Sequence, residues 1–199
     1  SGRYVLAFNG EIYNHRELRS NFNQAWIGHS DTETLLFLIE KYGLNIALEK
    51  SVGMFALALW DRENKKLQLA RDRFGEKPLY WGYLKNKKTS NKCFIFSSEI
   101  SAINNTSIFQ KNINMQAVID YFNYGYISSP LSIYTDVEQL KPGHLVKINS
   151  NEDGFAIAEK PRTSKWWNLD PLIEKNRLLE DKRQQQNSEK IYIDKIEEK

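Results

Sequence analysis

The run Asn9-Gly10-Glu11 combines three groups that acyl-transfer chemistry uses. The side-chain amide of Asn9 and the backbone N–H of Gly10 can donate hydrogen bonds to one oxygen while it gains negative charge, which is the task of an oxyanion hole. The adjacent carboxylate of Glu11 can bind a substrate ammonium group. Asn-Gly is also the commonest two-residue hairpin signal, so these residues by themselves leave a catalytic site and a simple turn both open.

Other residues with catalytic potential form no such pattern. His15, His29 and His144 are not spaced like metal ligands, and the chain contains no Gly-x-Gly-x-x-Gly, Walker A, Cys-x-x-Cys or His-Glu-x-x-His sequence. The single cysteine, Cys93, opens an apolar run at residues 94–96, where we expect a buried and unreactive side chain rather than a nucleophile. We predict no metal site.

Composition narrows the classes of protein that this chain can represent. The chain has 199 residues, of which 41% are hydrophobic and 27% charged, and this is the composition of a folded domain with room for a tail. The formal net charge of +3 is too small to indicate a nucleic-acid partner. The longest apolar stretch, residues 52–60, is too short to cross a bilayer, so we expect no membrane association. One cysteine allows no intrachain disulfide, which favours the reducing cytoplasm.

The elements around Asn9-Gly10-Glu11 follow from local patterns. Residues 3–8 form a β-rich run that leads into the Asn-Gly signal. Ser30 and Glu33 fit a capping box at the start of a helix that Gly43 ends. Residues 52–60 and 67–70 are predicted to form a hairpin. The further elements that we expect are a helix at 115–124 and strands at 79–84, 93–97, 145–148 and 155–158.

Residues 9–15, Asn-Gly-Glu-Ile-Tyr-Asn-His, resemble the glutamine-binding motif of glutamine-hydrolysing asparagine synthetases, which are class II glutamine amidotransferases. More matching runs follow in the family's order: Ser-Asp-Thr-Glu-Thr at 30–34, Gly-Met-Phe-Ala at 53–56, Leu-Ala-Arg-Asp-Arg-Phe-Gly-Glu-Lys-Pro-Leu-Tyr at 69–80, Ser-Ser-Glu at 97–99, Ser-Ile-Tyr at 132–134 and Leu-Lys-Pro-Gly-His at 140–144. The resemblance covers about residues 3–167. Collinear order over this length makes it far more specific than any single motif.

The resemblance implies an α+β fold of the N-terminal-nucleophile (Ntn) hydrolase type. This fold is a four-layer αββα sandwich of two stacked β-sheets, and we expect it to be incomplete at the N-terminus of this chain. Residues 1–168 would form part of the glutaminase domain. Residues 169–199 would form a linker and the start of an ATP-dependent synthetase domain that lies outside the chain. We therefore expect a fragment cut at both ends.

The resemblance also implies roles for individual residues. Asn9 and Gly10 would form the oxyanion hole and line the glutamine pocket, while Glu11 and Asp31 would bind the α-amino group of glutamine. Residues 71–75 would brace the fold through a buried ion-pair network. The nucleophile of the family is an N-terminal Cys that is absent from this chain, so we expect the chain by itself to be inactive.

The implied enzyme hydrolyses glutamine to glutamate and ammonia for the ATP-dependent amidation of aspartate. The implied partners are glutamine and the missing C-terminal synthetase domain, and a homodimer stays open. No cofactor is expected in this chain, whereas ATP and magnesium would bind in the synthetase domain. Two alternatives remain at this point: the glutaminase part of a sugar- or polysaccharide-modifying amidotransferase, and a catalytically dead glutamine-binding or scaffold module.

Overall fold

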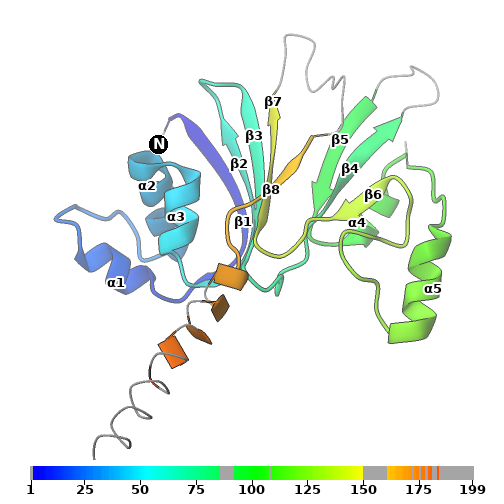
Figure 1. Cartoon of the computed structure of the whole chain (residues 1–199). Coiled ribbons are helices and arrows are strands. Elements are labelled where there is room, and N and C mark those ends of the chain that lie inside the picture. The colour runs from blue at the N-terminus through cyan, green and yellow to red at the C-terminus, as the bar shows by residue number, and fades with distance from the viewer. Residues whose placement is uncertain are drawn as a thin grey trace, which may run out of the picture. The chain divides into compact units, whose positions relative to one another are not determined.

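The computed structural model describes residues 2–85, 92–107, 109–149 and 161–171, together with 173–174, 176–177, 179–180 and 183. The chain divides into two units, Ser1–Trp167 and Asn168–Lys199. The elements of the first unit, shown in Figure 1, are β1 (Tyr4–Ile12), α1 (His15–Ser20), α2 (Asp31–Tyr42), α3 (Leu44–Lys50), β2 (Gly53–Asp61), β3 (Lys66–Arg71), β4 (Tyr80–Lys85), β5 (Lys92–Ser97), α4 (Ile100–Asn104), α5 (Met115–Tyr124), β6 (Val137–Gln139), β7 (His144–Asn149) and β8 (Thr163–Lys165).

The strands form two antiparallel sheets. The larger sheet has the order β1-β2-β3-β7-β8, and the smaller one has the order β5-β4-β6. The predicted hairpin is confirmed as the β2–β3 pair, and the predicted strands at 79–84 and 93–97 pair as β4 and β5. Within the described residues, β1 is an edge strand of the larger sheet, paired on one side with β2.

Three apolar clusters define the layers of the first unit. Helices α2 and α3 bury Leu38 and Leu48 against one face of the larger sheet, and each such side chain contributes roughly 1.5–3 kcal/mol of apolar burial. The other face of this sheet packs on Trp81 of β4, and the far side of the smaller sheet packs on Ile103 of α4. The order of layers is helices, sheet, sheet, helix (Figure 1), which confirms the predicted αββα arrangement.

Strand β1 is longer than the sequence pattern indicated. It runs from Tyr4 to Ile12, so the Asn-Gly pair lies inside the strand and the interpretation as a hairpin turn is wrong. Asn9, Gly10 and Glu11 stand opposite Ala56, Phe55 and Met54 of β2 in a continuous register. A Cβ on Gly10 would lie 2.1 Å from the carbonyl oxygen of Met54, so glycine here permits a close approach of two strands rather than a reversal.

The helices that follow β1 agree with the sequence in part. Ser30 is the N-cap of α2, and its hydroxyl accepts a hydrogen bond from the Thr32 N–H at 3.1 Å. Glu33 does not close a capping box, because its carboxylate accepts the N–H groups of Ile27 and Gly28 instead. Gly43 ends α2 with φ of 81°, as predicted. Helix α3 starts directly after it, without a side chain that caps its first turn.

The predicted helix at 115–124 is confirmed as α5, and strand 145–148 lies within β7. The predicted strand at 155–158 lies outside the described residues. Among the residues that are described, β7 pairs with β3 and β8. In the second unit, the described residues between 170 and 183 are helical, and the assignment of this unit to a synthetase domain stays a prediction. Across the part of the chain that is described, every helix is too short or too polar to cross a membrane.

Candidate functional site

The alternation of β1 determines where Asn9 and Glu11 lie. Phe8 and Ile12 belong to the cluster under α2 and α3, so the odd-numbered positions between them face the opposite side of the sheet. On that side Asn9 stands opposite Ala56, which packs toward the smaller sheet. The amide of Asn9 is therefore directed to the region between the two sheets, while Glu11 is exposed one step further along the same face.

A cavity of about 170 Å³ lies next to Asn9 between the sheets. The residues that line it come from β1, β2, Leu79 and the end of β5: Ala7, Phe8, Asn9, Ala56, Leu57, Ala58, Leu79, Phe96, Ser97 and Ser98. Its wall is mostly apolar, with Asn9 and the two serines as the polar exceptions. The serines belong to one of the matching runs, but no pattern in the sequence places them near Asn9.

The hydrogen-bond pattern of β1 orients the backbone N–H of Gly10. Tyr13 donates its N–H to Val52 at 2.7 Å, toward β2, whereas Ile12 donates its N–H to Asp31 Oδ2 at 2.8 Å. In an antiparallel pair, N–H groups point alternately toward and away from the partner strand. The N–H of Gly10 therefore points away from β2, like that of Ile12, at the open edge of β1. The side-chain amide that could act with this N–H belongs to the preceding residue, Asn9.

Asp31 joins the start of α2 to the end of β1. One carboxylate oxygen accepts the Ile12 N–H, and the other accepts the Thr32 N–H at 2.7 Å at the first turn of the helix. This position lies at the positive end of the helix dipole, which favours a charged carboxylate. Asp31 is thus hydrogen-bonded to the backbone of the residue that directly follows Glu11, two positions after Gly10.

The region around these carboxylates is negatively charged. Among the residues that the structure describes, no Lys or Arg forms an ion pair with Glu11 or Asp31. Partial burial, together with the negative charges of Glu76 and Glu11, raises the pKa of the Tyr13 hydroxyl. A cationic group that enters this region would meet carboxylates that form no ion pair with a Lys or Arg in the described part of the chain.

The Asp72 loop supports β2 behind the site, but not as predicted. Buried Asp72 accepts backbone N–H groups at 3.0–3.2 Å from Phe55, Phe74, Glu76 and Lys77. Arg71 donates at 2.7 Å to the carbonyl oxygens of Gly75, Lys77 and Leu140. The prediction of an ion-pair network is wrong, because main-chain groups satisfy the charges of Arg71 and Asp72. These hydrogen bonds fix the loop against β2, the strand that pairs with Gly10.

Cys93 departs from its prediction too. Its side chain is exposed rather than buried, because β5 lies at the edge of the smaller sheet and Cys93 sits near one end of that strand. It is not among the residues that line the cavity at Asn9. A role as nucleophile at this cavity therefore gains no support.

The fold indicates the class of protein to which this chain belongs. The fold is similar to the glutamine phosphoribosylpyrophosphate amidotransferase from B. subtilis complexed with ADP and GMP, with a TM-score of 0.51 and 19% identity over 82% of this chain and 29% of that one. It is also similar to the allosteric regulatory enzyme of purine biosynthesis, with a TM-score of 0.53 and 20% identity over 82% and 28% of the two chains. The chain has the Ntn-hydrolase fold of glutamine amidotransferases.

Sequence comparison identifies the family. The family model described as a glutamine amidotransferase domain matches residues 1–167, and the chain belongs to this family. It is 30% identical over 178 residues to asparagine synthetase [glutamine-hydrolyzing] 2 of Bacillus subtilis (strain 168), covering 86% of this chain and 22% of that protein. It is 33% identical over 184 residues to the protein assigned as asparagine synthetase [glutamine-hydrolyzing] 2 in Methanocaldococcus jannaschii, covering 89% and 33%. The chain thus spans a fifth to a third of the length of these relatives.

Proposed function

We propose that this chain is the glutaminase domain of a longer, glutamine-hydrolysing asparagine synthetase. The observation that carries the proposal is that β1 directs the Asn9 amide to the space between the sheets and turns the Gly10 N–H away from β2. The nearby carboxylates of Glu11 and Asp31 form no ion pair with a Lys or Arg of the described residues. Both relatives named above are asparagine synthetases, which favours aspartate over a sugar as the acceptor. The family match favours an enzyme over a scaffold module.

In the proposed reaction, Glu11 and Asp31 bind the α-ammonium group of glutamine. A Cys thiolate attacks the carbon of the side-chain amide, and the oxygen that becomes negatively charged accepts hydrogen bonds from the Asn9 amide and the Gly10 N–H. The C–N bond breaks, ammonia leaves with a transferred proton, and water then hydrolyses the thioester to glutamate. We assign the thiolate to a residue outside residues 1–199, because Cys93, the one cysteine of the chain, is exposed on β5.

The ammonia would then react with an aspartate carboxylate that ATP has activated. We assign ATP, magnesium and aspartate to a second domain of the longer protein and no cofactor to the residues of this chain. The 199-residue chain by itself should accordingly release no glutamate from glutamine.

The test uses the full-length enzyme that carries this domain. Asn9→Ala removes a donor to the developing oxyanion, so kcat of the glutamine-dependent reaction should fall about 100- to 1,000-fold. Synthesis from added ammonia bypasses the site and should stay unchanged. Asn45→Ala, the same substitution at an exposed position of α3, is the matched control and should leave both reactions intact. Normal glutamine turnover by Asn9→Ala, or an equal loss of both reactions, would contradict the proposed role.

A further inference from the structure

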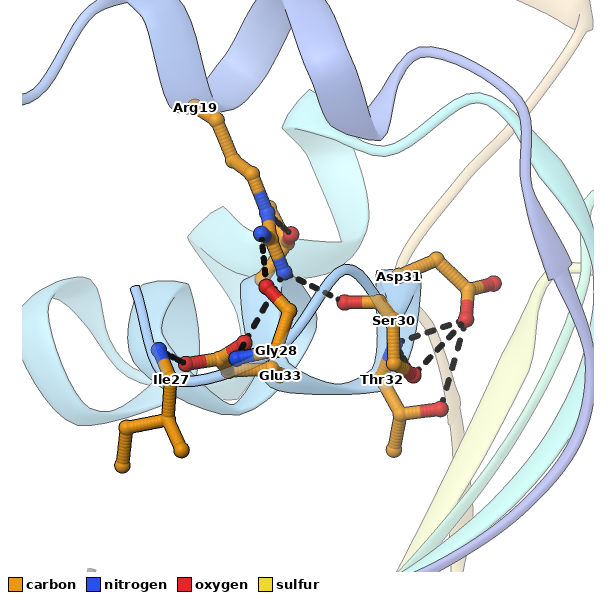
Figure 2. Close-up of polar contacts among 8 residues, drawn as sticks. Arg19, Ile27, Gly28, Ser30, Asp31, Thr32 and Glu33 are labelled. Carbon is orange, nitrogen blue, oxygen red and sulfur yellow. Dashed lines mark hydrogen bonds and ion pairs between the residues drawn. The ribbon is translucent and has the colours of Figure 1, made fainter. Parts of the chain in front are cut away.

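Arg19 and Glu33 form a polar cluster beside Asp31 that the proposed reaction does not yet use (Figure 2). We propose that these two side chains are positioning residues, which hold Asp31 ready for the α-ammonium group of glutamine. This inference rests on the proposed function, and it adds residues that make no contact with glutamine themselves. They act through the segment at 27–30 that leads into α2.

The guanidinium group of Arg19 binds two of the four backbone carbonyls of this segment. It extends from α1 and donates to the carbonyl oxygens of Gly28 and Ser30 at 2.7 and 2.6 Å. It also donates to Thr34 Oγ1 at 2.6 Å and forms an ion pair with Glu33 at 3.1 Å. The guanidinium carbon lies 4.4 Å from the centre of the Trp26 ring. Its side chain is only 12% exposed, so this arrangement is fixed by packing as well as by hydrogen bonds.

Glu33 binds two backbone N–H groups of the same segment. Its two carboxylate oxygens accept the N–H groups of Ile27 and Gly28 at 2.8 and 3.0 Å. These backbone hydrogen bonds, with the Arg19 charge, lower the pKa of Glu33, which keeps it ionised at neutral pH. Arg19 and Glu33 thus hold both polar edges of the segment from the side of α1 and α2.

The contacts of Arg19 and Glu33 with the segment at 27–30 determine where Asp31 lies. Arg19 holds the carbonyl of Ser30, the residue directly before Asp31, and Asp31 then reaches back to the Ile12 N–H. Because the Arg19 donors are directed to carbonyls, Thr34 and Glu33, the cation fixes the segment without pairing with Asp31. The Arg19 guanidinium therefore does not occupy the Asp31 carboxylate, to which an incoming ammonium group would bind.

A double-mutant cycle in the full-length enzyme separates this role from a general contribution to folding. Arg19→Ala should raise KM for glutamine about tenfold, as the loss of a positioning partner does at metal sites, with kcat and ammonia-dependent synthesis nearly unchanged. In an Asp31→Ala background, Arg19→Ala should add little further loss, because the residue that it positions is gone. Arg16→Ala, on the exposed side of the same helix, is the matched control.

Glu33→Gln provides a second variant of similar size, in case Arg19→Ala does not fold. The substitution removes the negative charge and one of the two acceptor oxygens of Glu33, so it should raise KM for glutamine by a smaller factor than Arg19→Ala does. If Asp31→Ala raises KM but Arg19→Ala does not, or if the two losses add in full, the positioning role is wrong and the proposed function stands. If Asp31→Ala leaves KM unchanged, the ammonium site itself is wrong, and the positioning role falls with it.

Discussion

Replacing Gly10 by alanine tests a close approach of β1 and β2. A Cβ at this position would lie 2.1 Å from the Met54 carbonyl oxygen and 2.7 Å from the Phe55 Cα. Ordinary contact between such atoms is about 3.5 Å, so the strands would have to separate by more than about 1 Å. Both of these atoms are backbone, and neither can rotate away as a side chain would.

The expected cost follows from this geometry. Adding a methyl group to a well-packed interior costs about 1–3 kcal/mol when side chains can adjust. Since the obstacle at Gly10 is backbone within a continuous register, we expect Gly10→Ala to lower the free energy of unfolding by at least ~3 kcal/mol. This is a large share of the roughly 5–15 kcal/mol of a typical domain. Urea unfolding of the 199-residue chain measures it.

Two further glycines separate the clash from other effects. A Cβ added at Gly2 would have no atom within 4 Å, so Gly2→Ala should change the free energy of unfolding by less than about 0.5 kcal/mol. Gly43→Ala also enters open space, but φ of 81° with ψ of 164° is a backbone region that almost only glycine adopts, so it should cost about 1–3 kcal/mol through backbone strain. If Gly10→Ala destabilises the chain no more than Gly43→Ala, the proposed steric reason for glycine at position 10 is refuted.

The remaining predictions concern two ionisable groups. The hydrogen bond from Arg3 holds the pKa of Asp61 well below its usual value, so the stability that Asp61 contributes is full above about pH 4 and is lost as the pH falls further. Acid unfolding of Asp61→Asn should show a flatter pH dependence than that of the unchanged chain. Burial raises the pKa of Tyr83 to about 12, so stability is full below about pH 10 and is lost as the pH rises toward 12. Tyr83→Phe should remove that alkaline loss, and an absorbance titration of tyrosinate should lose its latest-ionising component.

Local signals predicted those parts of the fold that depend on neighbours in sequence. The N-cap Ser30, the terminating Gly43 and helix α5 each follow from residues a few positions apart. Side chains alternate between the two faces of β1, and this alternation places Asn9 and Glu11 on one face. The sequence pattern ends the strand at the Asn-Gly signal, so it does not predict this placement. The Asn-Gly pair by itself leaves a turn open, because only pairing with β2, more than forty residues later, shows that the strand continues.

The features that escaped prediction depend on contacts distant in sequence. Arg19 reaches Thr34 from the preceding helix, and no periodicity marks it as anything but a surface cation. Asn9 and Ser97 line the same cavity only because the two sheets stack on each other. The exposure of Cys93 requires the order of strands in the smaller sheet. In each case the residue types were visible in the sequence, but the partner was chosen by the tertiary fold.

Gly10 shows how packing and chemistry can require the same residue at one position. The close approach of Met54 demands glycine whether or not the strand takes part in a reaction, so its identity alone does not indicate catalysis. The evidence for chemistry lies in the direction of its N–H, which the alternation between Tyr13 and Ile12 turns away from β2. A side chain at Gly10 would push β1 from β2 and displace that N–H together with the Asn9 amide. Loss of stability and loss of glutamine turnover should therefore appear together at Gly10, whereas at Asn9, whose side chain is exposed, turnover should fall alone.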